Sequence, residues 1–228
     1  MNPRPGHARP LPRRITGVIY DFDGTLADSI AVVVAATNAV LIDVGHAEIP
    51  AAEIMAGMVI PTAPRMGMHA GIADPARQAA MAQAFFVHAN RLGAGLARSY
   101  PGIAEMTGTI RARGLPQGVV SNNQGAFVRK VLAALALAGD IGCAFGEEDA
   151  PAPKPDPRGL LQVAAILGLD PAHCVYVGDT RGDAETAANA GMAAIGVTWG
   201  IHPRAELEQA PFAAIISSPA ELPVLIGM

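Results

Sequence analysis

Short apolar runs alternate with longer amphipathic segments along most of this chain. The first run, Ile15–Tyr20, lacks polar alternation, as expected of a strand buried on both faces of a sheet. Five similar runs follow, at Gly118–Ser121, Ile141–Phe145, Cys174–Gly178, Ala193–Val197 and Ala213–Ile216. The segments between them predict helices, at Gly102–Arg113, Gln124–Ala138, Asp156–Leu167 and Asp183–Ala190. Strands that alternate with helices indicate an α/β fold with a doubly wound parallel sheet.

Residues 27–97 break this alternation, because they are rich in Ala and Met and contain no convincing strand. Helical patterns cover Ser29–Val44, Ala51–Met58 and Pro75–Leu92, whereas prolines and glycines interrupt any pattern over Val59–Gly71. We therefore expect an α/β core formed by residues 15–26 and 98–228, with an all-helical unit inserted at 27–97. Four prolines and four arginines in residues 1–14 predict a disordered leader.

Composition narrows the class of protein. The chain has 228 residues, of which 51% are hydrophobic and 16% charged, so it can bury a sizeable core. A net charge of −4 argues against general nucleic-acid binding. No segment reaches the roughly 18 apolar residues of a membrane-spanning helix, and we expect no membrane partner. Two cysteines and no secretory signal favour a cytoplasmic protein, and we expect a monomer or homodimer.

Polar side chains follow several of the predicted strands. Because the carboxyl ends of parallel strands lie at one edge of a sheet, ligands bind there. The residues that the sequence places at this edge are Asp21 and Asp23, Ser121, Asn122 and Asn123, and Asp179 and Asp183. Lys154, one of two lysines in the chain, precedes a predicted helix in a proline-rich loop. Each of these residues alone has an ordinary explanation as a turn, a helix cap or a surface group; their shared location favours a site.

The predicted cluster carries an excess of negative charge. Its four carboxylates amount to four negative charges, of which Lys154 offsets one. Two unit charges about 4 Å apart repel by roughly 4 kcal/mol even at an effective dielectric constant near 20. A divalent cation is therefore needed, and oxygen ligands beside a phosphate favour Mg²⁺. A pocket with Mg²⁺ and a lysine is suited to phosphoryl transfer.

Four segments of the chain, in order, resemble the four motifs of the haloacid dehalogenase superfamily. They are Asp21-Phe22-Asp23-Gly24-Thr25, Ser121-Asn122-Asn123, Lys154-Pro155-Asp156-Pro157 and Gly178-Asp179-Thr180-Arg181-Gly182-Asp183. The resemblance covers nearly the whole chain after residue 14. Within the superfamily, the chain is similar to the phosphoglycolate phosphatase-like branch. The resemblance implies a Rossmann-like core with a helical cap inserted after the first motif.

The resemblance also implies a role for each matching residue. Asp21 is the nucleophile that forms an aspartyl-phosphate, and Asp23 is the general acid and base. Ser121 and Asn122 bind the phosphoryl group, and Lys154 bridges the nucleophile and the phosphate. The implied ligands of Mg²⁺ are Asp21, the backbone carbonyl of Asp23, and Asp179, with Asp183 in direct or supporting contact.

The four motifs are compatible with more than one reaction, and other residues help to choose among the reactions and substrates. Dehalogenases lack the acid found here at Asp23, and phosphonatases use a cap lysine, whereas both lysines of this chain lie outside 27–97. A phosphatase acting on a small phosphomonoester, with phosphoglycolate as leading candidate, is the favoured function. A phosphoglucomutase-like isomerase and a catalytically silent binding protein are the alternatives. Arg65, expected in a loop over Pro61–Gly67, is the candidate for gripping a substrate carboxylate or second phosphate.

Overall fold

A computed structural model describes residues 8–58 and 60–228 of the chain. The described chain divides into two compact units. One, the core unit, is built from the residues before Ser29 and after Ala97; the other, the inserted unit, is Ser29–Ala97. Part of the leader predicted at 1–14 lies outside the described residues. Residues 8–14 contain no helix or strand, and the Arg9 guanidinium donates a hydrogen bond to the carbonyl of Gly191.

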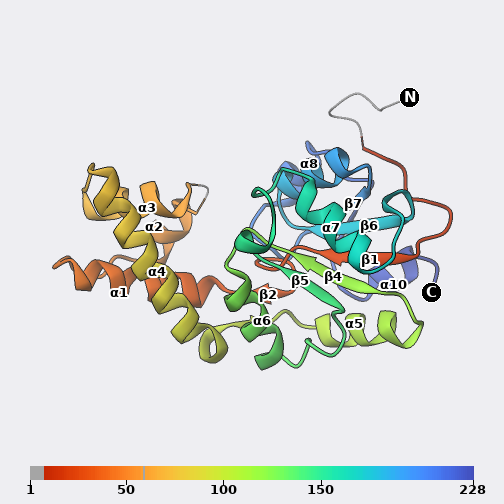
Figure 1. Ribbon diagram of the computed structural model, residues 1–228, viewed down its shortest axis with the longest axis horizontal. Helices are drawn as coiled ribbons and strands as arrows, with labels where there is room; N and C mark the ends of the chain where they lie inside the picture. Colours follow the sequence, from red (N-terminus) through yellow and green to blue (C-terminus); the bar gives the residue numbers. More distant parts are fainter. Residues whose placement is uncertain (1–7, 59) are drawn as a thin grey trace. The chain divides into compact units, whose positions relative to one another are not determined.

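Six parallel strands form the sheet of the core unit (Figure 1). Their order is β5 (Cys143–Phe145), β4 (Gln117–Val120), β1 (Gly17–Tyr20), β6 (Cys174–Gly178), β7 (Ala193–Val197) and β8 (Ala214–Ile216). All residues of β1, β4, β6 and β7 are buried, which explains why these strands read as continuous apolar runs. The order reverses direction at β1, and this arrangement confirms the predicted doubly wound α/β fold.

Helices cover both faces of the sheet. Figure 1 shows α7 (Arg158–Ile166) and α8 (Arg181–Ala190) on one side, and α5 (Ile103–Ala112) and α10 (Glu221–Leu225) on the other. The remaining core helices are α6 (Gly125–Ala134) and α9 (Arg204–Leu207), with single turns at Glu147–Asp149 and Pro171–His173. Leu160 and Val163 of α7 and Ala184 and Ala187 of α8 pack with Tyr176 of β6 in one buried cluster. The small α8 side chains let that helix approach the sheet closely.

Most helix ends follow the predicted signals, but α6 does not. The sequence predicts a helix over Gln124–Ala138 closed by Gly139, whereas α6 ends at Ala134. Ala136 adopts a positive φ of 58°, and the amide of Leu137 donates to the carbonyl of Leu132. An alanine thus takes the left-handed position at which glycine is expected. The buried side chain of Leu137 accompanies this early turn.

A two-stranded ladder closes the base of the insertion. Strand β2 (Ala27–Asp28) pairs antiparallel with β3 (Arg98–Ser99), so that Ala27 lies opposite Ser99 and Asp28 opposite Arg98. Residues 27 and 28 were expected to belong to the all-helical insertion, but they form a strand within the core unit. Strands of two residues carry no periodicity that a sequence pattern can detect.

The inserted unit is formed by α1 (Ile30–Asp43), α2 (Ala51–Ala56), α3 (Thr62–Ala70) and α4 (Pro75–Leu96). The expectation of an irregular Val59–Gly71 was wrong, because α3 occupies most of it. Pro61 lies just before the helix, where its missing amide hydrogen costs nothing, and Gly71 ends the helix with a φ of 63°. Pro61 and Gly71 therefore mark the two ends of a helix, Pro64 lies in its first turn, and only Gly67 lies within it.

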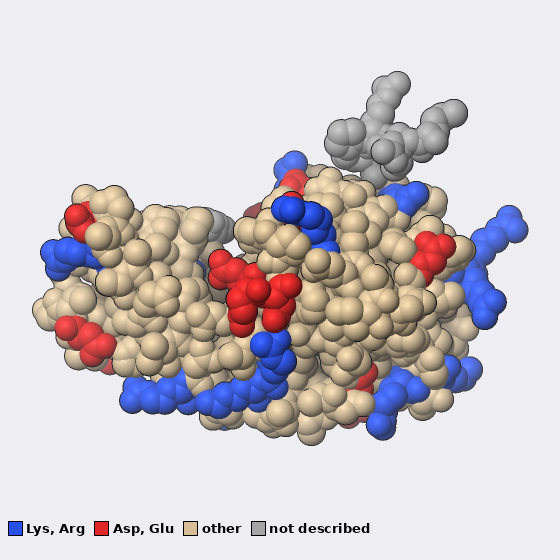
Figure 2. Space-filling model, in the orientation of Figure 1, with Lys and Arg blue, Asp and Glu red and all other residues tan. Residues whose placement is uncertain are grey.

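The surface carries few charges. Figure 2 shows a face that is mostly uncharged, with Lys and Arg side chains in separate groups and acidic side chains in several groups, of which the largest lies near the middle of the view. Within residues 8–58 and 60–228, no helix is long and apolar enough to cross a membrane.

Candidate active site

Three buried carboxylates meet beyond the carboxyl ends of the central strands. Asp21 follows β1 directly, Asp179 follows β6, and Asp183 lies in the first turn of α8. Each offers an oxygen within 4.8 Å of the other two. Asp179 and Asp183 are 0% exposed and Asp21 is 7% exposed. Since β1 and β6 are neighbours in register, with Tyr20 opposite Val177, their following residues are brought together.

Lys154 enters this cluster from the loop before α7. Its ammonium nitrogen lies 2.7 Å from Oδ1 of Asp21 and 2.7 Å from Oδ1 of Asp183. Its third contact is the Tyr176 hydroxyl, at 3.0 Å. Only a tenth of the lysine side chain is exposed. Lys154 therefore links the predicted nucleophile to the acid of the fourth motif.

Asp183 has a structural contact as well as its place in the cluster. Oδ2 accepts hydrogen bonds from the amide and hydroxyl of Thr180, at 3.0 and 2.6 Å, and the Asp183 amide donates back to that hydroxyl. This is a capping box at the start of α8. Oδ1 is left to face Lys154. Asp183 therefore takes part in capping α8, as the third helical residue and not as the N-cap, and it also lies beside Lys154 and the other two carboxylates.

Asp179 lies between two glycines that leave no room for a side chain. A Cβ atom built on Gly24 would lie 2.2 Å from Oδ2 of Asp179, and one on Gly200 only 2.4 Å from it. The Thr25 hydroxyl donates to Oδ1 at 3.2 Å, and the Ile201 amide donates to Oδ2 at 2.7 Å. The Trp199 indole donates to the carbonyl of Thr25, which ties the loop after β7 to the first motif. Backbone packing and hydrogen bonds together fix the position of this carboxylate.

Burial makes ionisation of the cluster unfavourable in the protein alone. Desolvation, with the nearby Asp183 carboxylate, raises the pKa of Asp179 to about 7. Burial and Asp183 likewise raise the pKa of Asp21 well above its usual range, although Lys154 opposes the shift. Burial acts to lower the pKa of Lys154, but the carboxylates of Asp183 and Asp21 outweigh it and hold that pKa above its ordinary value. The site therefore has more acidic groups than its one lysine stabilises.

The chemistry of these ligands fits a divalent metal ion. Three carboxylate oxygens converge within 4.8 Å, and their mutual repulsion and burial penalise ionisation without a cation. Oxygen-only ligands select hard ions such as Mg²⁺, Mn²⁺ or Ca²⁺. Asp21, Asp179 and Asp183 are the residues that would hold the ion in the part of the chain that the structure describes.

The other site residues that the sequence predicted in the core unit also lie at the carboxyl edge of the sheet. Ser121 follows β4 and is 3% exposed, and its hydroxyl oxygen accepts a hydrogen bond from the Asn123 amide at 3.0 Å. The Asn123 side chain donates to Oδ2 of Asp23 at 3.1 Å. Asn122 pairs with the backbone of Lys154, since its amide donates to the carbonyl at 3.2 Å and its oxygen accepts from the amide at 2.7 Å. The Asn122 side chain thus positions the lysine loop.

Arg65 lies in the inserted unit, within α3 and not in the expected loop. It is 6% exposed, and its guanidinium carbon lies 5.4 Å from the centroid of the Phe85 ring in α4. Its Nε atom is buried and has no hydrogen-bond partner among the described residues, and burial lowers the pKa of the guanidinium. This burial shows that Arg65 is not a solvent-exposed surface arginine. Its predicted role toward a substrate stays a prediction.

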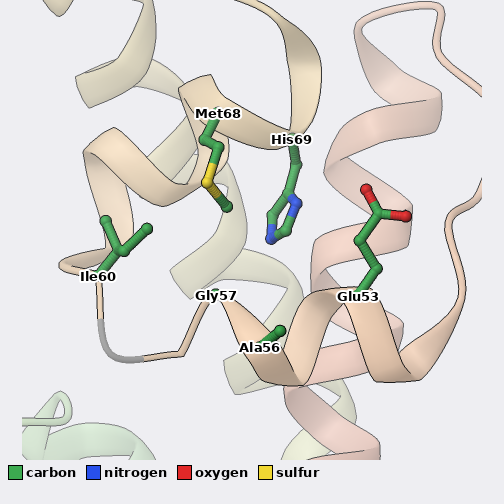
Figure 3. A pocket seen from close by; sticks show the side chains of 6 residues that line it. All are labelled: Glu53, Ala56, Gly57, Ile60, Met68 and His69. Carbon is green, nitrogen blue, oxygen red and sulfur yellow. The ribbon is translucent and has the colours of Figure 1, made fainter.

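The inserted unit contains a cavity of about 310 Å³ between α2 and α3. Figure 3 shows the His69 ring reaching from α3 toward the end of α2, with Glu53 on the neighbouring turns. Within residues 8–58 and 60–228, the buried Nε2 atom of His69 has no hydrogen-bond partner, and burial and the Arg65 charge lower the pKa of this histidine. The other lining residues are Ala56, Gly57, Ile60 and Met68.

Sequence reasoning assigned no role to several side chains that build the site, although it placed Asn123 at this edge of the sheet. Tyr176 contacts Lys154, Asn123 contacts Asp23, and Thr25 and Trp199 support Asp179. A tyrosine inside an apolar strand was one available signal, because a buried phenol hydroxyl requires a partner. Nothing in the sequence indicates that the Trp199 indole returns to the first motif.

Known proteins resemble this chain in sequence and in fold. A sequence model of haloacid dehalogenase-like hydrolases matches residues 18–197. Phosphoglycolate phosphatase 1 of Pseudomonas aeruginosa is 30% identical over 223 residues, covering 91% of this chain and 77% of its own. Phosphoglycolate phosphatase of Pseudomonas putida is 29% identical over 188 residues, covering 80% and 69%.

A solved structure shows the same architecture. A predicted phosphoglycolate phosphatase from Haemophilus somnus superposes with a TM-score of 0.82 at 22% identity, covering 92% of this chain and 97% of its own. The parallel sheet with a buried acidic cluster at its carboxyl edge, together with these relatives, defines an enzyme, a phosphoric monoester hydrolase. The chain belongs to the haloacid dehalogenase-like hydrolase family.

Proposed function

We propose that this enzyme is a Mg²⁺-dependent phosphatase that hydrolyses a small phosphomonoester through an aspartyl-phosphate on Asp21. The observation that carries the proposal is the 2.7 Å contact of Lys154 with Asp21 inside a cluster of buried carboxylates. This lysine holds one oxygen of the nucleophile and offers positive charge where a phosphoryl group would arrive. Catalysis of phosphoryl transfer consists largely of such positioning and charge stabilisation.

The reaction proceeds in two displacements at phosphorus. In the first, a carboxylate oxygen of Asp21 forms a bond to phosphorus as the bond to the ester oxygen breaks, and Asp23 gives that oxygen its proton. In the second, Asp23 takes a proton from water, whose oxygen bonds to phosphorus and releases Asp21 and inorganic phosphate. Asn123 donates to the Asp23 carboxylate at 3.1 Å and holds it for both steps.

Other residues bind the transferring group. Ser121 offers its hydroxyl, and the backbone amide of Asn122 lies in the same turn after β4. The ligands that we assign to Mg²⁺ are Asp21, Asp179, Asp183 and the backbone carbonyl of Asp23. When bound, the ion supplies positive charge that offsets the carboxylates and the dianionic phosphate.

Phosphoglycolate is the leading candidate substrate. The two Pseudomonas relatives carry the name phosphoglycolate phosphatase and cover most of this chain. Arg65, whose buried Nε has no hydrogen-bond partner in the part of the chain that the structure describes, is the proposed group for a substrate carboxylate. The inserted unit at 27–97 would act as the cap that sets this specificity. We also expect the enzyme to act in the cytoplasm, as a monomer or homodimer, without nucleic-acid or membrane partners.

The test is a panel of phosphomonoesters assayed with and without Mg²⁺, with phosphate release and product identity both measured. The proposal predicts Mg²⁺-dependent phosphate release, fastest with phosphoglycolate. Isomerisation of a sugar phosphate without phosphate release would replace the proposal with a mutase. No turnover of any compound would indicate a binding protein. Undiminished activity in excess EDTA would contradict the metal requirement.

A further inference from the structure

We propose that Tyr176 is a positioning residue that fixes the ammonium group of Lys154 for catalysis. The inference deepens the proposed function and rests on it for the catalytic role of Lys154. Tyr176 lies outside all four motifs, three residues before Asp179 in the buried strand β6. It is 0% exposed, so its hydroxyl cannot exchange its protein partners for bulk water.

The three hydrogens of the lysine ammonium match three acceptors. Asp21 and Asp183 each present Oδ1 at 2.7 Å, and the Tyr176 hydroxyl lies at 3.0 Å. An ammonium has three donors and no acceptor, so these contacts use its full capacity. With all three directions occupied, the group cannot rotate or tilt without losing a bond. Tyr176 supplies the third direction and adds no further charge to the acidic cluster.

The chemistry of the hydroxyl fixes its own direction. It lies 3.0 Å from the carbonyl of Val120 and 3.4 Å from Oδ1 of Asp183. Lys154 can only donate, so a lone pair of the hydroxyl faces the lysine, and the hydroxyl proton is left for an acceptor, of which the Val120 carbonyl is nearer than Oδ1 of Asp183. Val120 is the last residue of β4 and immediately precedes Ser121. Tyr176 therefore connects the backbone beside the phosphate-binding serine to the lysine that contacts the nucleophile.

Removing this hydroxyl would leave one ammonium hydrogen without a partner in a buried site. The ammonium would then shift toward either carboxylate or recruit a water, and its contact with Asp21 would lose a fixed direction. The aromatic ring would remain, with Lys154 Nζ 5.6 Å from its centroid. The Tyr176→Phe variant thus tests the hydroxyl and retains the packing.

A matched control exists on the neighbouring strand. Tyr20 of β1 is also 0% exposed, and its hydroxyl donates to Oε1 of Gln117 at 2.8 Å, away from Lys154. Tyr20→Phe removes a buried phenol hydroxyl from a central strand just as Tyr176→Phe does. Any effect of Tyr176→Phe that comes from core packing alone should appear in both variants.

The first readout is nuclear magnetic resonance of protein labelled with ¹⁵N-lysine. The chain has two lysines, so exposed Lys130 gives an internal reference for Lys154. In the unaltered protein and in Tyr20→Phe, the Lys154 ammonium protons should exchange slowly with water and give a sharp signal. In Tyr176→Phe their exchange should be faster by roughly 10-fold or more, because one hydrogen bond is lost. An unchanged Lys154 signal in Tyr176→Phe would overturn the proposal.

The second readout is steady-state kinetics on the phosphomonoester that the panel shows to be hydrolysed fastest. Loss of an orienting group, as opposed to a binding group, should lower kcat by roughly 10-fold with little change in KM. Tyr20→Phe should keep both constants within about twofold of the unaltered enzyme. Equal losses in the two variants would assign Tyr176 a packing role only. Because the resonance experiment needs no turnover, failure of the proposed phosphatase activity would leave the lysine contact separately tested.

A measurement on the unaltered protein covers the case in which Tyr176→Phe does not fold. A nuclear Overhauser contact between the Lys154 ammonium protons and the Tyr176 ring protons is expected from the 5.6 Å separation of Nζ and the ring centroid. Its absence, with the ammonium signal assigned, would contradict the arrangement.

Discussion

At the scale of single residues, the site assigns the two oxygens of one carboxylate to different partners. Oδ2 of Asp183 caps α8 through Thr180, and Oδ1 faces Lys154. The helix therefore holds the carboxylate in the orientation that the lysine requires. Asn122 acts similarly, because its side chain fixes the backbone of Lys154 in the loop before α7. Asp183 and Asn122, which belong to the sequence motifs, thus also fix the position of Lys154 and its loop.

Replacement of the nucleophile should separate catalysis from stability. In Asp21→Asn, the near-isosteric amide cannot attack phosphorus, so turnover should fall by roughly 10³-fold or more. The pKa of Asp21 is raised chiefly by burial, so its charged form is costly without metal, and a neutral group should not lower the melting temperature of the metal-free protein. Phosphate release and thermal unfolding measure the two effects. Substantial residual turnover would rule out Asp21 as the nucleophile.

At the scale of elements, the sequence predicted the strands and helices that show a hydrophobic periodicity. It did not predict the elements whose formation depends on backbone contacts between distant segments. All six strands of the main sheet and the core helices α5 to α8 follow from buried runs and helical patterns, although α6 ends early, whereas the short helices α9 and α10 were not predicted. Helix α3 was missed because its flanking Pro61 and Gly71 looked like interruptions, and β2 and β3 are too short to show a pattern. The acidic cluster was predictable because parallel strands share an edge. The loop after β7 was not, since its contacts to the first motif depend on tertiary packing.

The requirement for a glycine beside Asp179 can be tested by substitution of Gly200, with Gly182 as the control position. A Cβ on Gly200 would lie 2.3 Å from the Cβ of Asp179, so Gly200→Ala must displace the carboxylate or the loop. We expect Mg²⁺ affinity, measured by titration calorimetry, to fall by roughly 10-fold or more. Gly182→Ala is the control, because a Cβ there meets its nearest neighbour, the Thr180 hydroxyl, at an ordinary 3.6 Å. Equal affinity in both variants would show that the positioning of Asp179 tolerates this crowding.

The proposed role of Arg65 can be tested by comparing two substrates. Arg65→Ala should raise KM for a phosphomonoester that carries a carboxylate by about 10-fold or more, matching about 1.4 kcal/mol of lost charge-assisted bonding. The KM for an aryl phosphate should barely change, because its leaving group carries no charge for the guanidinium to bind. Since Arg65 also packs against Phe85, Phe85→Leu serves as a control that alters packing and retains the charge. If Arg65→Ala affects both substrates equally, its role is confined to the packing of the inserted unit.

At the scale of the whole molecule, stability should depend on pH and metal together. The pKa of Asp179 is about 7 in the folded metal-free protein, against an ordinary value near 3.9. Between these values the folded protein keeps a proton that the unfolded chain releases. The free energy of unfolding should therefore decrease as pH rises from about 4 to about 7, since the folded state binds more protons there. Bound Mg²⁺ should restore stability, and more so at pH 8 than at pH 5, because its ligands must be ionised.

Urea unfolding at several pH values in EDTA, repeated with Mg²⁺, measures this linkage. In Asp179→Asn the decrease of stability with pH should be shallower, because the group that titrates has been removed. The same slope in both proteins would mean that Asp179 does not bind a proton in this range.

The short β2–β3 ladder has a consequence for how the chain folds. Val18 of β1 must pair with Gln117 of β4, although the whole inserted unit separates them in the sequence. The entropy of closing a loop rises with the logarithm of its length, so an unfolded insertion makes this pairing slow as well as costly. Once Ala27 lies opposite Ser99, the folded insertion leaves and rejoins the core at neighbouring residues. The folded insertion then adds little to the effective loop length between β1 and β4. The parallel sheet can therefore form nearly as fast as one in which no unit is inserted after the first strand.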